Sequence, residues 1–370
     1  MVKKIRVIHF TIANVGGGTT KSVLRLWKYI DRERFQFDFV TMSDKLDFAA
    51  ELESEGCKVY YLSAYAEDNP ELFNKEVRDI LSNGYDVIHL QTSHWRGFAI
   101  EKIAKEIGIP KVIIHSNMTN VPDKKGKSRE MERRRHFQQR ELLTEDMATD
   151  FLACSDAAAE WLYGDRIPKE KIKIVLHAIE LEDYKYNEYT RIKYREVLGI
   201  KDEFVIGHVG RFEYQKNHEF LIDVFQDIAR IDNQVKLLLV GVGELQETVK
   251  RRVKELGIKS KVIFTGKRND VAGLMQAMDV FAFPSRHEGF GIVLIEAQAA
   301  GLKCITSKGI PYETKITDNI EFLELDKKIW MDGILKYKDG YVREDMSEIM
   351  EAKGWGMKAH AAIMEQIYLN

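Results

Sequence analysis

The sequence predicts an α/β protein made of two similar halves, each a parallel β-sheet covered by helices on both faces. The chain has 370 residues, which is too many for one ordinary core and suits two domains. Short apolar runs of strand length alternate with amphipathic helical patterns along the chain. This alternation starts again at Phe204, after a charged and polar stretch over 179–201 that is typical of a linker.

In the first half, the strand Ile5–Thr11 leads into a glycine-rich turn and then into a helix over Ser22–Tyr29. Two further helical patterns cover Phe98–Ile107 and Ala157–Tyr163. The other expected strands are Phe37–Thr41, Val59–Leu62, Val87–Gln91, Lys111–His115, Asp150–Cys154 and Ile172–Leu176. Strands separated by helices favour a parallel sheet, because each crossover needs a helix to return the chain.

The second half repeats this pattern. Its expected strands are Phe204–Val209, Val235–Val240, Val262–Thr265, Val280–Phe283 and Lys303–Thr306. Its expected helices are His218–Arg230, Leu245–Leu256, Val271–Met278 and Ile292–Ala300, followed by a helical stretch over Val342–Tyr368. We therefore expect a first domain over 1–178, a second over 179–350, and a C-terminal helix over 351–370 that packs back on the first domain. Two such sheets facing each other would place a substrate cleft between them.

Composition excludes several classes of function. Hydrophobic residues make up 45% and charged residues 31% of the chain, as in soluble globular proteins. A net charge of −2 argues against a nucleic-acid partner held by bulk charge. The three cysteines, Cys57, Cys154 and Cys304, lie too far apart for a disulfide framework or a zinc site. No apolar run is long enough to span a bilayer, so we expect a cytoplasmic protein that can still associate with a membrane surface.

Two glutamates frame a glycine-containing turn after the predicted strand Val280–Phe283. The first opens the segment Glu288–Gly291, and the second, Glu296, lies about one turn inside the next helix. Backbone N–H groups at that helix start, at Ile292 and Val293, can bind an anion. Both carboxylates can face one ligand at different heights and accept hydrogen bonds from sugar hydroxyls. The alternative is an ordinary helix start with an acidic cap and a surface glutamate.

Two basic residues follow another predicted strand. Gly210 and Arg211 come directly after Phe204–Val209, and Lys216 lies five positions beyond Arg211. A guanidinium and an ammonium group placed together can bind a diphosphate and stabilise it as a leaving group without a metal. The alternative is a solvated basic loop.

Two further loops lie at predicted strand ends. Gly16, Gly17 and Gly18 follow the first strand and let the backbone approach a ligand closely, although they match neither common phosphate-binding fingerprint. His115 ends the predicted strand Lys111–His115, where a doubly wound sheet binds its ligands. A tight turn and a structural histidine are the respective alternatives.

A basic run within 124–135 can contact an anionic bilayer or a lipid diphosphate, and its interleaved acidic residues also fit a solvated helix. The residues of this possible membrane contact are Lys124, Lys125, Lys127, Arg133, Arg134 and Arg135. No Asp-x-Asp triplet occurs in the sequence, so we expect neither a bound metal nor another cofactor.

Together these segments resemble the retaining glycosyltransferases of family 4, which have the GT-B fold of two Rossmann-like domains. The most specific likeness is the pair of glutamates separated by seven residues, Glu288 and Glu296, preceded in the chain by Gly210-Arg211 and Lys216-Asn217. The glycine-rich first loop and His115 also match, in the family's order. The likeness covers nearly the whole chain.

The resemblance implies that the domain over 1–178 binds the acceptor and the domain over 179–350 binds a nucleotide-sugar donor, of which a UDP-sugar is the commoner kind. It also implies a role for each residue. Arg211 and Lys216 would bind the donor diphosphate, Glu288 the sugar hydroxyls and Glu296 the ribose, with His115 near the anomeric carbon. The implied donor-binding residues are Gly16, Gly17, Gly18, Gly210, Arg211, Lys216, Arg268, Glu288, Gly289, Phe290, Gly291, Ile292, Val293 and Glu296, and the implied catalytic residues are His115, Arg211, Lys216 and Glu288.

At the joint between the halves the chain departs from the family's usual pattern. His177 replaces an asparagine, within His177-Ala178-Ile179-Glu180, and the segment resembles a subset of capsular and exopolysaccharide transferases. We therefore expect transfer to a glycan or lipid-linked acceptor in surface polysaccharide synthesis. A nucleotide-sugar epimerase or hydrolase, and a nucleotide-sugar sensor or inactive subunit, are the alternatives from other classes.

Overall fold

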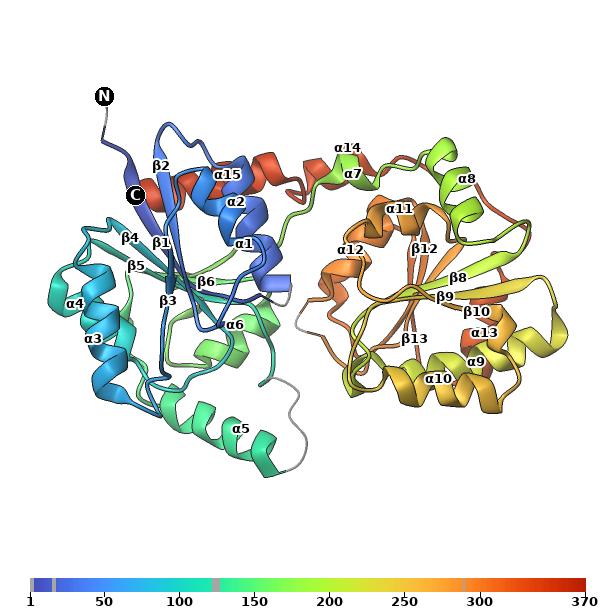
Figure 1. Cartoon of the computed structure of the whole chain (residues 1–370), viewed down its shortest axis with the longest axis horizontal. Coiled ribbons are helices and arrows are strands. Elements are labelled where there is room, and N and C mark those ends of the chain that lie inside the picture. Colours follow the sequence, from blue (N-terminus) through green and yellow to red (C-terminus); the bar gives the residue numbers. More distant parts are fainter. Residues whose placement is uncertain (1–2, 15–17, 122–126, 289) are drawn as a thin grey trace. The chain divides into compact units, whose positions relative to one another are not determined.

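The computed structural model describes residues 3–14, 18–121, 127–288 and 290–370. The chain divides into two compact units, Met1–Ala178 together with Met357–Asn370, and Ile179–Gly356. Each unit is built on a parallel sheet with helices between successive strands, which confirms the predicted α/β fold class (Figure 1).

In the described part of the first unit, the sheet has the order β3-β2-β1-β4-β5-β6-β7, and all pairs are parallel. The strands are β1 (Ile5–Ile12), β2 (Phe35–Thr41), β3 (Val59–Tyr61), β4 (Val87–Thr92), β5 (Lys111–Ser116), β6 (Asp150–Ala153) and β7 (Ile172–Ile174). The order of the strands reverses between β1 and β4. In a doubly wound sheet, ligands bind at this reversal, outside the carboxyl ends of the strands.

The helices of the first unit are α1 (Gly18–Tyr29), α2 (Ala49–Ser54), α3 (Pro70–Leu81), α4 (Ala99–Ile107), α5 (Lys127–Arg140), α6 (Asp156–Tyr163) and, from the end of the chain, α15 (Met357–Leu369). Helix α15 packs beside α1 (Figure 1). Glu365 accepts a hydrogen bond of 3.0 Å from the backbone N–H of Asp31, and Tyr368 is buried against Phe35 and Phe37. The C-terminal helix therefore completes the core of the first unit.

The sheet of the second unit has the order β10-β9-β8-β11-β12-β13 and is also parallel. Its strands are β8 (Phe204–Val209), β9 (Val235–Val240), β10 (Val262–Phe264), β11 (Val280–Phe283), β12 (Lys303–Ser307) and β13 (Ile320–Leu323). Its helices are α7 (Leu181–Tyr184), α8 (Glu188–Val197), α9 (His218–Ile231), α10 (Gln246–Glu255), α11 (Val271–Gln276), α12 (Ile292–Ala299), α13 (Lys327–Leu335) and α14 (Ser347–Ala352).

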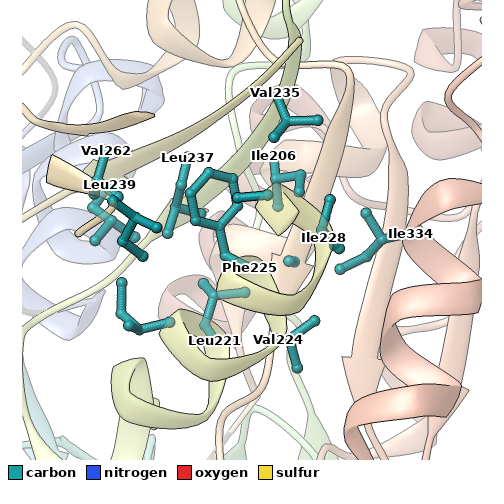
Figure 2. Packing of buried hydrophobic residues seen from close by; sticks show 14 of the residues in the cluster. Ile206, Leu221, Val224, Phe225, Ile228, Val235, Leu237, Leu239, Val262 and Ile334 are labelled. Carbon is teal, nitrogen blue, oxygen red and sulfur yellow. The ribbon is translucent and has the colours of Figure 1, made fainter. Parts of the chain in front are cut away.

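Helix α9 forms the centre of one core of this unit. Its apolar residues Leu221, Phe225 and Ile228 recur at helical spacing and are at most 1% exposed. Figure 2 shows Phe225 directed toward Leu237 of β9 and Ile206 of β8, and these residues belong to one buried cluster. Burying this face fixes α9 on the sheet and, with it, the loop that leads into its first turn.

The predicted linker over 179–201 is wrong, because it contains two helices that pack on the second unit. Arg191 of α8 pairs with Asp279 at 2.6 Å, and the buried Arg195 donates hydrogen bonds to the carbonyls of Lys201 and Glu203. The charges that made this stretch resemble a linker are thus used in contacts within the unit.

Helix ends near both termini also differ from the prediction. The expected helix over Val342–Tyr368 is two helices, α14 and α15, separated by a turn in which Gly354 has a φ of 79°. Helix α1 begins at Gly18 rather than Ser22, and in its first turn the Thr20 hydroxyl accepts a hydrogen bond of 3.0 Å from the Ala13 N–H. Within the described ranges, no helix has the length and hydrophobicity needed to cross a bilayer.

Candidate functional site

Lys216 and Glu288 form a direct ion pair in the second unit. The Lys216 Nζ lies 2.6 Å from Glu288 Oε1, and the two side chains are only 13% and 8% exposed. The residues are 72 positions apart in the sequence, and they meet because they follow β8 and β11, which are neighbours in the sheet. Two separate sequence patterns thus converge on one place at the carboxyl edge of the sheet.

The loops that hold this pair are tied to each other by hydrogen bonds. The Arg286 N–H donates to the Gln215 carbonyl, and the Gln215 side-chain amide donates to the His287 carbonyl, both at 2.8 Å. The Arg286 guanidinium also donates to the side-chain oxygen of Asn217, at 2.8 Å. Asn217 adopts a left-handed φ of 54° directly before α9. These contacts fix the backbone around Lys216 and Glu288, as a binding site requires.

A third loop, after β9, packs directly on the loop that carries Lys216. A Cβ atom at Gly241 would overlap the carbonyl oxygen of Gly210, and one at Gly243 would overlap the backbone of Phe212. Only glycine allows these backbones to approach so closely. Sequence reasoning did not assign Gly241 and Gly243 to the site, although two glycines directly after a buried strand were a usable indication.

The helix that follows Glu288 begins where the sequence predicts. Gly291 has a left-handed φ of 84° and precedes Ile292, the first residue of α12. Phe290 is buried and stacks on Trp355, with the ring centroids 5.2 Å apart. Glu296 is 7% exposed inside α12, so it is not the surface residue of the alternative interpretation. The N–H groups of the first turn of a helix have no partner within the helix and attract anions. Gly289 lies outside the described residues.

Two arginines predicted for the site make other contacts. Arg211 is exposed and pairs with Glu213 at 2.7 Å. The Arg268 Nε donates to Asp270 at 2.7 Å, and Asp270 also accepts a hydrogen bond from the Tyr194 hydroxyl at 3.0 Å. A ligand would therefore have to compete with a carboxylate for each guanidinium.

Two histidines that sequence reasoning missed lie buried beside Lys216. The ring centroid of His208 lies 4.7 Å from that of His218, and the His208 Nδ1 donates to the Ala282 carbonyl at 2.8 Å. Burial, reinforced by the charge of Lys216, lowers the pKa of His208 to about 4. Burial also lowers the pKa of His218 to about 2, and the nearby His208 and the charge of Lys216 act in the same direction. Both imidazoles are therefore neutral at pH 7.

These pKa values predict that the second unit loses stability in mild acid. Below pH 6.5 the unfolded chain takes up a proton at each histidine and the folded unit does not. The free energy of unfolding therefore has its full value above that pH and decreases as the pH falls. The slope is at most about 1.4 kcal/mol per pH unit for each histidine. Urea unfolding at pH 7 and pH 5 should show a smaller loss for His208→Phe than for the unsubstituted protein. An identical loss in both would contradict the assignment.

In the first unit, His115 is buried at the carboxyl end of β5, as predicted. Its Nδ1 lies 3.2 Å from His89 Nε2, and the two rings are stacked with centroids 5.4 Å apart. The other nitrogen of His89, Nδ1, lies 2.8 Å from the Tyr368 hydroxyl of α15. Burial lowers the pKa of His115 well below its usual value, so the ring is neutral. The contacts hold His115 in one orientation.

His177, the unusual residue at the joint, belongs to the same group of rings. It stacks on His115 at 6.3 Å, and its Nδ1 lies 2.9 Å from the Ser22 hydroxyl of α1. Within the described ranges, no three His, Cys, Asp or Glu side chains are arranged to hold a metal ion. Gly18 opens α1, whereas Gly16 and Gly17 lie outside the described residues.

The described part of the basic run lies in helix α5, and a helix is what the interleaved charges also fitted. Arg133 and Arg134 are exposed, and Arg134 pairs with Glu130 one turn away. Arg135 is partly exposed and pairs with Glu67 at 3.5 Å. Lys124 and Lys125 lie outside the described residues, and Lys127 is the first residue of the helix. Arg135 thus has an acidic partner from another part of the unit, as Arg134 has one within the helix.

Several known proteins are similar to this chain in sequence and in fold. Residues 17–176 match the family model of the glycosyl transferase 4-like domain, and residues 190–324 match that of the glycosyl transferases group 1. The Bacillus subtilis (strain 168) protein EpsF, classed among glycosyltransferases, is 32% identical over 310 residues, which cover 82% of this chain and 79% of EpsF.

Two more distant proteins extend the likeness. The Escherichia coli UDP-Gal:α-D-GlcNAc-diphosphoundecaprenol α-1,3-galactosyltransferase is 24% identical over 326 residues, covering 82% of this chain and 79% of its own. The crystal structure of Anabaena HepE in complex with UDP and glucose superposes with a TM-score of 0.77 at 19% identity, over 99% of both chains. The two family models and the identity to EpsF show that this chain belongs to the glycosyltransferases of the group 1 and 4-like families, which have the GT-B fold.

Proposed function

We propose that the chain transfers a sugar, with retention of anomeric configuration, from a UDP-sugar to a glycan or lipid-linked acceptor in surface polysaccharide synthesis. The observation that supports this most is the buried contact of Lys216 with Glu288 beside the first turn of α12. It places a cation, a carboxylate and backbone N–H groups together, which are the groups needed for a diphosphate and for sugar hydroxyls.

In this proposal each group has a separate task. The Lys216 ammonium and the N–H groups of Ile292 and Val293 bind the donor diphosphate, and they stabilise the charge that develops as the sugar–phosphate bond breaks. Glu288 accepts hydrogen bonds from the donor sugar, while Glu296 binds the ribose. The leaving phosphate assists attack on the same face of the sugar, so no protein side chain acts as a nucleophile.

The names of the relatives support the choice of donor and acceptor. The Escherichia coli enzyme uses a UDP-sugar and an acceptor on diphosphoundecaprenol, and HepE was crystallised with UDP. A Campylobacter jejuni relative, 35% identical over 133 residues, also acts on a diphospho-undecaprenol acceptor. The acceptors of these two relatives are consistent with the lipid-linked, surface-polysaccharide acceptor that we propose.

Incubation with a panel of UDP-sugars and lipid-linked acceptors tests the proposal. We expect release of UDP together with a new α-linked product from an α-linked donor, identified by the coupling constant of its anomeric proton. A β-linked product would contradict retention. Binding without turnover on any acceptor would instead indicate a sensor or inactive subunit, and conversion of the donor into another UDP-sugar would indicate an epimerase.

Replacing Glu296 separates a ligand-binding role from a structural one. Glu296→Gln keeps the size of the side chain and removes the charge that the ribose hydroxyls would meet. We expect the Kd for UDP to rise by about tenfold, as when one charge-assisted hydrogen bond is lost, while the melting temperature changes little. Calorimetric titration with UDP and a thermal unfolding scan measure the two effects. A lowered melting temperature with unchanged UDP affinity would assign Glu296 to the fold alone.

A further inference from the structure

The loop that leads into α12 packs on a tryptophan from the C-terminal part of the second unit. The Phe290 and Trp355 rings stack with their centroids 5.2 Å apart and their planes 23° apart. Both side chains are only 4% exposed, although neither residue belongs to a helix or to a strand of the sheet. Neither residue is part of the core around α9 that Figure 2 shows. The contact therefore fixes one connecting segment against another.

The backbone that carries the indole is itself fixed on both sides. The Trp355 N–H donates to the carbonyl of Met350 in α14 at 3.0 Å, and the Trp355 carbonyl accepts from the Ile179 N–H at 2.9 Å. Ile179 and Gly356 also form an isolated parallel bridge. A side chain on a backbone held in this way can order the loop that stacks on it.

Phe290 connects this tryptophan to the donor-binding groups. It lies two residues after Glu288 and two residues before Ile292, the first residue of α12. The loop is held at Glu288 by the ion pair with Lys216, and at Phe290 by the stacked rings. A shift of the Phe290 ring would therefore move the N–H groups of the first turn of α12, which are the groups that we assign to the diphosphate.

We propose that Trp355 is a positioning residue of the donor site, which acts through Phe290 to hold the first turn of α12 in its diphosphate-binding orientation. The inference rests on the proposed function and adds a residue that no sequence pattern assigned to the site. Stacked aromatic pairs stabilise a structure beyond the area they bury, and a shift of about 1 Å in a positioning group can strongly weaken a site. A tryptophan that served the fold alone would affect stability without affecting how the site distinguishes phosphate groups.

Calorimetric titration of Trp355→Leu with UDP and with UMP tests the proposal. This variant keeps an apolar side chain and removes the stacking. We expect the Kd for UDP to rise by about threefold to tenfold, the range for one aromatic pair. The Kd for UMP should rise less, because UMP has no β-phosphate. Trp355→Phe keeps a ring that can stack, and should restore UDP affinity. Trp355→Met, with a longer apolar side chain, takes the place of Trp355→Leu if that variant does not fold.

A double-mutant cycle tests whether Trp355 acts through Phe290. Phe290→Leu removes the same contact from the side of the loop and should also weaken UDP binding. Since one contact is lost in each case, Trp355→Leu combined with Phe290→Leu should bind UDP about as weakly as the weaker of the two single variants. Two independent contributions would instead give losses that add as free energies.

Trp330→Phe is the control for stability. Trp330 also packs on a phenylalanine of the second unit, Phe220, with the ring centroids 5.3 Å apart, but it belongs to the core around α9. This variant should have a lower melting temperature and the same ratio of UDP to UMP affinity as the unsubstituted protein. Unchanged UDP affinity in Trp355→Leu, equal losses for UDP and UMP, or additive losses in the cycle would overturn the inference. Failure of the unsubstituted protein to bind UDP would instead contradict the proposed function.

Discussion

Lys216→Ala should lower the rate of UDP release by about a hundredfold to a thousandfold, the loss typical of removing one group that stabilises charge in a transition state. Two effects act together. In the proposed site the diphosphate would lose the ammonium group that binds it, and the buried Glu288 carboxylate loses the ammonium that lies 2.6 Å away. Breaking one half of a buried ion pair costs about 3–5 kcal/mol. Steady-state kinetics with a UDP-sugar measures the rate, and a thermal scan measures the accompanying loss of stability.

Two further variants separate charge from folding. Lys308→Ala removes a lysine from an exposed pair with Glu324, at 2.8 Å in the same unit, and should leave the rate nearly unchanged. The double variant Lys216→Met with Glu288→Gln replaces the ion pair with neutral groups of similar size, and should fold normally yet remain inactive. Near-normal turnover in Lys216→Ala would remove this residue from the site.

Gly241→Ala should abolish measurable UDP binding while the unit still folds. The new methyl group would overlap the Gly210 carbonyl oxygen, which is backbone and cannot rotate away. The loop from Gly210 to Lys216 would therefore shift, and a shift of about 1 Å in a positioning group can cost a factor of 100 in rate. Calorimetric titration with UDP measures the loss of binding, and circular dichroism reports whether the unit is folded.

Gly257→Ala is the control for backbone strain alone. Gly257 also has a positive φ, 70°, but a Cβ atom there would meet no atom within 4 Å. It should cost about 1–2 kcal/mol of stability and leave UDP binding intact. If the two variants bind UDP equally well, the close approach of Gly241 to Gly210 has no part in the site.

The parts of the site that follow strand ends could be predicted from the sequence. Lys216 and Glu288 each come shortly after an apolar strand pattern, and parallel strands bring their carboxyl ends to one edge. The start of α12 and the position of His115 at the end of β5 were predictable for the same reason, since each depends on a local pattern. These local patterns also fix the α/β class.

Features that depend on which elements become neighbours could not be predicted. Gly241 approaches Gly210 only because β9 pairs with β8. His208 is covered by His218, which stacks on Phe212 with the ring centroids 4.0 Å apart. The pairing of Arg135 with Glu67 could not be predicted because Glu67 precedes a different helix, α3. Strand β13 was missed because Ile320–Leu323 is short and has no alternating pattern. Tertiary contacts decide each of these positions.

A crystal structure of the protein with UDP tests the central claim most directly. We expect the diphosphate to contact Lys216 Nζ and the N–H groups of Ile292 and Val293, with the ribose hydroxyls against Glu296. Glu288 should lie on the side of the β-phosphate to which the donor sugar would be attached, close enough to accept hydrogen bonds from that sugar. UDP bound at another place in the chain, or a diphosphate that contacts neither Lys216 nor the first turn of α12, would contradict the account.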